Sequence, residues 1–367
     1  MLKVVLSGGP CGGKSTAIKT ICEEFSKIGY NVLVIPETAT ELISNGIAPG
    51  FDINMDEFQS FVLDKQLFKE ELYLKSLKYF NEDKTIILYD RCILDQMAYI
   101  KDSKMKQLLK ERGLSIANVN ERYDIIIHLV TAAKGTDCYT TENNTARRET
   151  LKEAILVEDK TLKANLNHPH IKVVDNSTDF ETKIQKVINI IKHSLNTSAP
   201  LEIERKFLVK QPEIGFLNNL EYCSKAEIVQ TYLTSITKKT SRRIRQRGNK
   251  EDGYSFYYTE KSPYEGIKRI ENEKIISFSE YVNYLNEADT NLHQIKKTRY
   301  CFIYENQFFE LDIYPFNDDY AILEIELLCE DEEIKLPDFL TLIKEVTDDK
   351  RYKNHAIAKD LTFPDLK

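Results

Sequence analysis

The sequence of 367 residues contains no tryptophan, only six histidines and seven widely scattered cysteines. No two cysteines form a C-x-x-C pair, and the nearest histidines, His168 and His170, flank a proline in a predicted loop. Structural zinc sites and disulfide frameworks require closely spaced or regularly spaced ligands and thiols. The sequence therefore argues against both.

Long hydrophobic runs are also absent. The longest apolar stretches, residues 85–89 and 124–130, have the length of a strand, whereas a membrane-spanning helix needs roughly 20 residues. The first seven residues run directly into glycines and lack the apolar region and cleavage site of a signal peptide. We expect a cytoplasmic protein that makes no use of a membrane.

Glycine and proline are sparse, at 13 and 10 residues, while 42% of the chain is hydrophobic and 30% is charged. This composition excludes collagen-like, low-complexity and intrinsically disordered chains. The formal net charge of −7 argues against a surface that is basic throughout, although a local basic cavity remains compatible with it. The length predicts two domains.

Two different hydrophobic periods divide the chain. Up to residue 192, short apolar segments at residues 3–7, 31–35, 85–90, 124–130 and 171–174 alternate with amphipathic helical stretches. This pattern predicts an α/β domain with a parallel sheet over residues 1–192. The small, polar segment 193–200 is predicted to be a linker.

Residues 201–327 alternate with a period of two, which indicates antiparallel strands. The tail from about residue 337 returns to helical spacing, so we expect helix there. The second domain is predicted to cover residues 201–367.

A phosphate-binding loop follows the first predicted strand. Residues 8–15, Gly-Gly-Pro-Cys-Gly-Gly-Lys-Ser, satisfy the pattern G-x-x-x-x-G-K-[ST] between a strand and a helix. The glycines allow backbone N–H groups to surround phosphate oxygens, Lys14 supplies positive charge, and the Ser15 hydroxyl can bind Mg²⁺. This segment predicts a nucleotide site.

Charged residues follow two other strands of the same domain, at the edge where open α/β sheets bind ligands. Glu37 follows residues 31–35, and Asp90 and Arg91 follow the apolar run 85–89. Glu37 is a candidate base or metal-water ligand, and Asp90 stands at the Walker B position. Arg147 and Arg148, after a polar segment, are candidates for a lid over phosphates. For Glu37 and Arg147, an ordinary surface charge is an equally good interpretation.

These segments resemble the AAA_28 family of P-loop ATPase or kinase domains and, more loosely, nicotinamide-riboside and deoxynucleoside kinases. The resemblance implies ATP as the ligand and a kinase acting on a small metabolite or nucleoside. Catalytic roles are then expected for Glu37, Asp90 and Arg91. The residues that carry the resemblance and the expected nucleotide contacts are Gly8, Gly13, Lys14, Ser15, Thr16, the segment 36–39, the helix 59–66, the segment 89–91, Asp95, the pair 98–99, Arg147 and Arg148.

In the second domain, charges of both signs occupy one face of successive predicted strands. Strand side chains repeat every two residues, so Glu202, Glu204 and Lys206 share a face, as do Arg243 and Arg245. A solvated sheet face is the ordinary explanation for any one strand. Because the pattern recurs along the domain, we expect instead a closed ionic interior in which opposite charges compensate one another.

The same strands resemble the CYTH family, also called triphosphate tunnel metalloenzymes. The signature E-x-E-x-K corresponds to residues 202–206, and the later elements follow in order. The resemblance implies an eight-stranded antiparallel tunnel that binds a triphosphate with Mg²⁺ or Mn²⁺. Its expected phosphate ligands are Lys206, Arg243, Arg245, Lys261, Arg269, Lys297 and Arg299.

The resemblance also implies metal ligands and catalytic groups in this tunnel. Carboxylates are the hard oxygen ligands that Mg²⁺ and Mn²⁺ prefer. The expected ligands are Glu202, Glu204, Glu324 and Glu326, with Glu271, Glu273, Glu310 and Asp312 completing a second cation site or holding the attacking water. Lys206 and Asp312 are expected to be catalytic, and Ser15 is the metal ligand of the first domain.

Three functions remain open on these residues. The first is a bifunctional enzyme, a P-loop kinase or ATPase joined to a phosphohydrolase that acts on tripolyphosphate, a nucleoside triphosphate, thiamine triphosphate or RNA 5′ ends. The second is a cyclase that makes cyclic AMP in the same tunnel. The third is a module that senses polyphosphate or a nucleotide and regulates the ATPase domain. The oligomeric state is left open.

Overall fold

The computed structural model describes residues 1–134, 150–195, 203–235, 240–263, 269–327 and 332–364; for residues 262, 263 and 269–271 it describes the backbone. The chain divides into two compact units, Met1–Lys192 and His193–Lys367.

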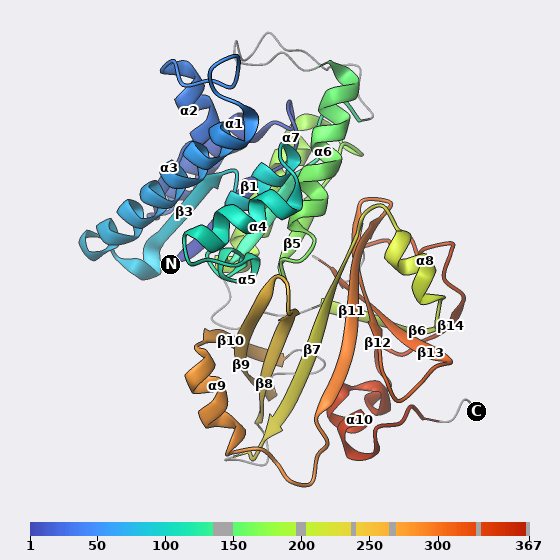
Figure 1. The fold of residues 1–367 in the computed structure, drawn as a ribbon. Helices are drawn as coiled ribbons and strands as arrows, with labels where there is room; N and C mark the ends of the chain where they lie inside the picture. The colour runs from blue at the N-terminus through green and yellow to red at the C-terminus, as the bar shows by residue number, and fades with distance from the viewer. Residues whose placement is uncertain (135–149, 196–202, 236–239, 264–268, 328–331, 365–367) are drawn as a thin grey trace. The chain divides into compact units, whose positions relative to one another are not determined.

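The first unit is built on a five-stranded parallel sheet in the order β2-β3-β1-β4-β5 (Figure 1). All five strands lie where the apolar segments predict them, and the α/β fold is confirmed. Their bounds are β1 Leu2–Ser7, β2 Asn31–Ile35, β3 Thr85–Asp90, β4 Ile125–Leu129 and β5 Ile171–Val174.

Helices connect these strands and cover the sheet. The central strands contain runs of side chains with no exposed area, Val4–Leu6 in β1 and Ile86–Leu88 in β3, as expected for parallel strands covered on both faces. The helices are α1 Lys14–Lys27, α2 Thr38–Ser44, α3 Met55–Ser76, α4 Asp102–Glu111, α5 Ile116–Asn120, α6 Leu151–Asn165 and α7 Phe180–Leu195, with 3-10 turns η1 Leu77–Tyr79, η2 Glu82–Lys84 and η3 Ile93–Ala98.

The second unit is an antiparallel sheet of nine strands in the order β10-β9-β8-β7-β11-β12-β13-β6-β14. The strands are β6 Ile203–Lys210, β7 Cys223–Leu233, β8 Ser241–Asn249, β9 Gly253–Pro263, β10 Arg269–Ile276, β11 Ile295–Tyr304, β12 Gln307–Ile313, β13 Tyr320–Leu327 and β14 Leu342–Glu345. The short helices are α8 Ile214–Asn219, α9 Phe278–Leu285, η4 Lys350–Tyr352 and α10 Asn354–Asp360. The predicted antiparallel fold is confirmed.

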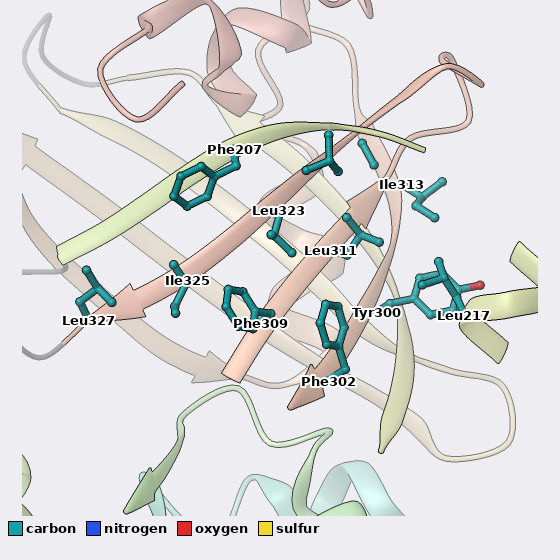
Figure 2. Close-up of a cluster of buried hydrophobic side chains, with 12 residues drawn as sticks. Phe207, Leu217, Tyr300, Phe302, Phe309, Leu311, Ile313, Leu323, Ile325 and Leu327 are labelled. Carbon is teal, nitrogen blue, oxygen red and sulfur yellow. The ribbon is translucent and has the colours of Figure 1, made fainter. Parts of the chain in front are cut away.

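The outer face of the second sheet carries its main hydrophobic core. Phe207, Phe309, Leu311, Leu323 and Ile325 project from β6, β12 and β13 into one cluster (Figure 2). Leu217 of α8 packs into the same cluster and has no exposed area. The residues between them in sequence therefore point to the opposite, inner face.

The inner face is ionic in its middle and apolar at one end. Three apolar residues lie on the inner face, each two positions along its strand from a polar one: Leu208 from Lys206, Tyr232 from Gln230 and Ile322 from Glu324. They pack with residues of η4 and α10 into a second cluster. Strands β6 and β7 both contribute to this cluster, although three strands separate them in the sheet order. The sheet is therefore curled around its inner face, and one end is filled by side chains.

The tail differs from its predicted helical structure. Residues 342–345 form strand β14, which pairs with β6, and the tail is helical only in the 3-10 turn η4 and in α10, which begins at residue 354. Without β14 the described part of β6 would be a sheet edge with unpaired backbone groups, which is the physical reason for a strand here. This short strand also brings the sheet to nine strands rather than eight.

Helix α7 ends at Leu195, so the first three residues of the predicted linker are helical, and residues 196–200 lie outside the described ranges. None of the described cysteines forms a disulfide. The described helices include none that is both long and apolar enough to cross a bilayer.

Candidate active sites

The P-loop has the backbone conformation that its glycines allow. Gly8 and Gly13 have φ angles of 127° and 89°, values that other residues rarely adopt. A Cβ at Gly8 would collide with the carbonyl oxygen of Leu129, and one at Gly13 would lie 2.6 Å from the Phe180 ring. The loop leads directly into α1, where Ser15 and Thr16 are exposed in the first turn and accessible to a ligand.

Lys14 lies inside this loop and is almost fully buried. Its Nζ donates hydrogen bonds to the carbonyl oxygens of Gly8 and Gly9, both at 2.8 Å. Burial, reinforced by the nearby guanidinium of Arg91, lowers the pKa of Lys14 to about 8. An anion bound in the loop would offset both effects.

The strand-end residues predicted from the sequence meet at the P-loop. Arg91 donates from Nε to Glu37 at 2.6 Å and from a terminal nitrogen to the Gly8 carbonyl at 3.0 Å. Arg91 also has a φ of 75°, an uncommon backbone conformation that is typical of functional sites. Glu37 thus joins Arg91 beside Lys14, whereas Arg147 and Arg148 lie outside the described residues.

The two carboxylates at this site differ in character. Burial alone would raise the pKa of Glu37, but Arg91 and Lys14 lower it to about 2. Burial and the neighbouring Glu37 raise the pKa of Asp90. Among the described residues, Oδ1 of Asp90 has no hydrogen-bond partner. Glu37 is therefore a fixed anion, and Asp90 is the more basic group.

A buried pair that the sequence analysis did not identify, Glu158 and His128, supports the P-loop. Glu158 of α6 accepts a hydrogen bond from the Gly9 N–H at 2.5 Å and lies 2.8 Å from Nε2 of His128 on β4. Although burial opposes it, these contacts lower the pKa of Glu158 to about 2. The sequence signal that could have indicated this pair is His128, a histidine within an otherwise apolar predicted strand.

A cavity of about 370 Å³ opens beside these residues. Glu37, Asp90 and Arg91 lie at one part of its wall, and Phe58, Val62 and other apolar side chains line the rest. Gln59 and Gln66 of the predicted helix 59–66 belong to α3 and line it too. The helix 59–66 is part of the resemblance to P-loop ATPase and kinase families, but the sequence alone does not indicate a cavity.

In the second unit, the predicted ionic residues converge on the inner face. Lys206 binds Glu204 at 2.8 Å and also pairs with Glu324 on the neighbouring strand β13. Burial alone would lower the pKa of Lys206, but these two carboxylates raise it above its usual value. Glu324 is almost fully buried, so this charge pair is withdrawn from bulk solvent.

Arg299 of β11 is the centre of a second, more deeply buried group. Its guanidinium forms two hydrogen bonds of 2.7 Å with the two oxygens of Asp312, and it also binds Glu310 and Glu324. Lys297 pairs with the same Asp312 carboxylate, which has no exposed area. Asp312 therefore holds two cations in place and is not accessible to solvent.

Strand β8 contributes a row of arginines to the same face. Arg245 binds Glu273 of β10 at 2.8 Å and lies 4.8 Å above the Tyr257 ring. Arg247, which the sequence analysis did not select, is buried and lies 4.0 Å from Glu310. It continues the two-residue spacing from Arg243 and Arg245, so the signal was present in the sequence.

The remaining predicted residues are more exposed or lie outside the described part. Glu326 is exposed, and Lys261 is half-buried on β9. Glu202 lies outside the described residues, and for Arg269 and Glu271 only the backbone is described. Their predicted roles stay predictions.

The carboxylates of the inner face suit a hard divalent cation. Glu204 and Glu326 are directly opposite each other on β6 and β13, and Glu310 and Glu324 are opposite on β12 and β13. Like charges in such positions destabilise a sheet unless a cation compensates them, as Arg299 does for Glu310 and Glu324. Within the described ranges, no three acidic, histidine or cysteine side chains are already gathered as a metal site.

Comparison with known proteins agrees with this division. An AAA domain family model, AAA_28, matches residues 3–183, and a CYTH domain model matches residues 200–353. An inorganic triphosphatase of Nitrosomonas europaea is 35% identical over 159 residues, which are 43% of this chain and 96% of the relative.

Two solved structures are also similar. One, of an inorganic triphosphatase, is 30% identical with a TM-score of 0.31 and covers 45% of this chain and 97% of its own. A thymidylate kinase from Ehrlichia chaffeensis is 16% identical with a TM-score of 0.36 and covers 52% of this chain and 98% of its own. On the family models and the 35% identical relative, the chain belongs to the CYTH family and carries an AAA_28-type P-loop domain ahead of its CYTH domain.

Proposed function

We propose that the second unit is a metal-dependent triphosphatase that cleaves the terminal phosphate from a short triphosphate such as tripolyphosphate. The observation that carries the proposal is the buried ionic face on which Lys206, Lys297 and Arg299 gather. The similarity to an inorganic triphosphatase supports the same reaction.

The cations fall into two groups with different roles. Lys297 and Arg299 are held by Asp312, so they form a fixed group of paired charges beneath the site. The β8 arginines Arg243, Arg245 and Arg247 and the lysine Lys206 then contact phosphate oxygens, to which arginine can bind in a bidentate manner. Because these groups are fixed before substrate arrives, they can stabilise charge that develops in the transition state.

Glu204 and Glu326, which face each other on β6 and β13, would hold Mg²⁺ or Mn²⁺. Glu324 already pairs with Lys206 and Arg299, so it would join them only by exchanging one of these cations for the ion. When bound, the ion supplies charge compensation and an oriented water to phosphoryl transfer. The chain's own carboxylates orient the attacking water and keep Lys206 protonated through the pairs that raise its pKa. We propose that Asp312 positions the neighbouring cations and is not a direct metal ligand, because it already pairs with Lys297 and Arg299 and has no exposed area.

The test is hydrolysis of tripolyphosphate, ATP and 5′-triphosphorylated RNA by the full chain in Mg²⁺ or Mn²⁺. We expect metal-dependent release of phosphate, and Glu204→Gln should lower the rate about 100-fold or more because it removes an anionic metal ligand. The matched control is Glu345→Gln, whose carboxylate pairs with Arg205 at the exposed edge of the same sheet and should leave the rate unchanged.

Two outcomes would contradict this function. No turnover of any of the three substrates by the wild-type chain would leave a binding or sensing module as the better explanation. Release of pyrophosphate with formation of cyclic AMP would identify a cyclase instead.

For the first unit we propose binding of ATP with Mg²⁺ by the P-loop. Lys14 would exchange its bonds to the Gly8 and Gly9 carbonyl oxygens for bonds to phosphate, and Ser15 would face the metal. Equilibrium dialysis with labelled ATP should detect binding that Lys14→Ala removes. Lys19→Ala, on α1 outside the loop, is the control that should bind normally.

A further inference from the structure

Two buried side chains outside the P-loop hold one of its peptide groups. We propose that Glu158 and His128 are positioning residues of the ATP site, and that they set its affinity by fixing the peptide that joins Gly8 to Gly9. Neither side chain has exposed area, so both act through this peptide and not by touching the nucleotide. The inference rests on the proposed binding of ATP by the first unit.

The peptide group is held from both sides. On one side, the carbonyl oxygen of Gly8 accepts hydrogen bonds from Nζ of Lys14 at 2.8 Å and from Arg91 at 3.0 Å. On the other side, the N–H of Gly9 donates to Oε2 of Glu158 at 2.5 Å. The C=O and N–H of a trans peptide lie in one plane and point in opposite directions. Turning this peptide would therefore break the contacts on both sides.

His128 fixes the carboxylate that receives this bond. Oε1 of Glu158 lies 2.8 Å from Nε2 of His128, so each oxygen of the carboxylate has a partner. His128 belongs to β4 and Glu158 to α6, so both members of the pair come from elements outside the loop. A charged acceptor also makes the bond from the Gly9 N–H stronger than a neutral acceptor would.

The loop and the carboxylate are packed so closely that only glycine fits between them. A Cβ on Gly9 would lie 2.6 Å from Oε2 of Glu158 and 3.0 Å from its Cβ. Gly9 does not have a positive φ, unlike Gly8 and Gly13. Its backbone conformation would accept another residue, so the contact with Glu158 is the reason for a glycine at this position.

Other parts of the loop are held by different contacts. The carbonyl oxygen of Pro10 accepts a hydrogen bond from the Thr131 hydroxyl, and that of Cys11 accepts one from the N–H of Ala132 at 3.2 Å. Both partners follow β4. Loss of Glu158 should therefore release the Gly8–Gly9 peptide while the rest of the loop stays in place.

The orientation of this peptide matters because it keeps two cations together before ATP arrives. Lys14 and Arg91 repel each other, and the carbonyl oxygen of Gly8 offsets this repulsion by accepting from both. If the peptide turned, its oxygen would leave both cations, and ATP would have to restore the arrangement as it binds. When only a fraction of the free protein has the competent form, the apparent affinity falls by that fraction.

The test measures the binding of labelled ATP to the full chain by equilibrium dialysis. Every chain carries Glu204→Gln, so that the second unit consumes little ATP, and the binding that Lys14→Ala removes is assigned to the P-loop. We expect Glu158→Ala to raise the Kd for ATP about tenfold or more, the value of a lost hydrogen bond to a charged group. Glu158→Gln keeps an acceptor oxygen for Gly9 and should recover most of the affinity.

The matched control is Glu70→Ala. Glu70 is an almost fully buried carboxylate of the same unit, and its partners are Gln66, Arg122 and Tyr123. Its removal should destabilise the unit to a similar degree and leave the Kd for ATP unchanged. Circular dichroism checks that each variant is folded under the conditions of the dialysis.

A measurement on the unaltered chain does not depend on how the variants fold. In the absence of ATP, the amide hydrogen of Gly9 should exchange slowly with solvent, because it is bonded to a buried acceptor that holds the loop. Hydrogen exchange resolved by NMR reports this amide directly.

The results separate this inference from the proposed function. An unchanged Kd in folded Glu158→Ala, an equal rise in Glu70→Ala, or fast exchange of the Gly9 amide overturns the positioning role and leaves the ATP site intact. Failure of the wild-type chain to bind ATP overturns the proposed function of the first unit and this inference with it.

Discussion

At the scale of single residues, the most informative side chain is Asp312. It is completely buried, holds Arg299 through both oxygens and also pairs with Lys297. Removing one member of a buried charge group is costly because the others are left without compensation. We therefore expect Asp312 to contribute more to the stability of the second unit than any exposed charged residue does.

We expect Asp312→Asn to lower the free energy of unfolding of the second unit by about 3 kcal/mol, since two buried cations lose their anion. Chemical denaturation of the full chain, followed by a probe in the second unit, measures it. The control Glu345→Gln breaks an exposed pair with Arg205 and should cost less than about 1 kcal/mol. Similar losses in the two variants would show that Asp312 is not a central support.

A second residue-scale prediction concerns Glu158 and pH. Its pKa is about 2 in the folded unit and near 4.5 when unfolded, so its contribution is fully present above pH 4.5 and is lost as pH falls toward 2. The shift corresponds to about 3 kcal/mol. The difference in unfolding free energy between wild type and Glu158→Gln should shrink as the pH falls from 5 toward 3. A difference that does not vary over this range would contradict the assignment.

At the scale of elements, strand β8 carries arginines on both of its faces, and we expect only those on the inner face to bind phosphate. Arg245 points to the inner face and binds Glu273, whereas Arg242, three residues earlier in the strand, pairs with Glu287 on the other side. Alternate residues of a strand point to opposite faces, so one substitution per face tests the assignment within a single element.

Arg245→Gln should raise the KM for tripolyphosphate about tenfold or more, because a charge-assisted bond to phosphate is lost. Arg242→Gln should leave that KM unchanged while the strand keeps its fold. Steady-state kinetics of both variants measure the contrast. If the two substitutions had the same effect, the inner face of β8 would not be a phosphate site.

The elements also show how far sequence reasoning reaches. The five strands of the first unit could be placed almost to the residue, because each is an apolar run between polar segments. Strand β14 could not, since its four residues are mostly exposed and it forms by pairing with β6. The alternating charges predicted which residues share the inner face, but the choice of partners, such as Arg299 with Asp312, depends on the register between strands.

Contacts distant in sequence were likewise not predictable. Glu158 and His128 come from a helix and a strand that no local pattern relates, and only the folded sheet brings both to Gly9. The cavity beside the P-loop arises in the same way, from α2, α3 and η3 together.

At the scale of the whole molecule, the two compact units each carry their own set of site residues. We expect Lys14→Ala to abolish ATP binding while tripolyphosphate hydrolysis stays within about twofold of wild type, because no residue of the inner face belongs to the P-loop. Glu204→Gln should have the opposite pattern. The two activities of each full-length variant are measured side by side, and parallel losses in both would mean that the units act as one coupled site.

The apolar cluster at one end of the curled sheet limits what the second unit can process. Leu208, Tyr232 and Ile322 continue the ionic face and pack against side chains of η4 and α10, so this end of the inner face is filled. A linear phosphate chain bound on the ionic face would end against this apolar cluster. Phosphate units beyond the ionic face would stay in solvent and add nothing to binding, so we expect short phosphate chains to be preferred over long polymers.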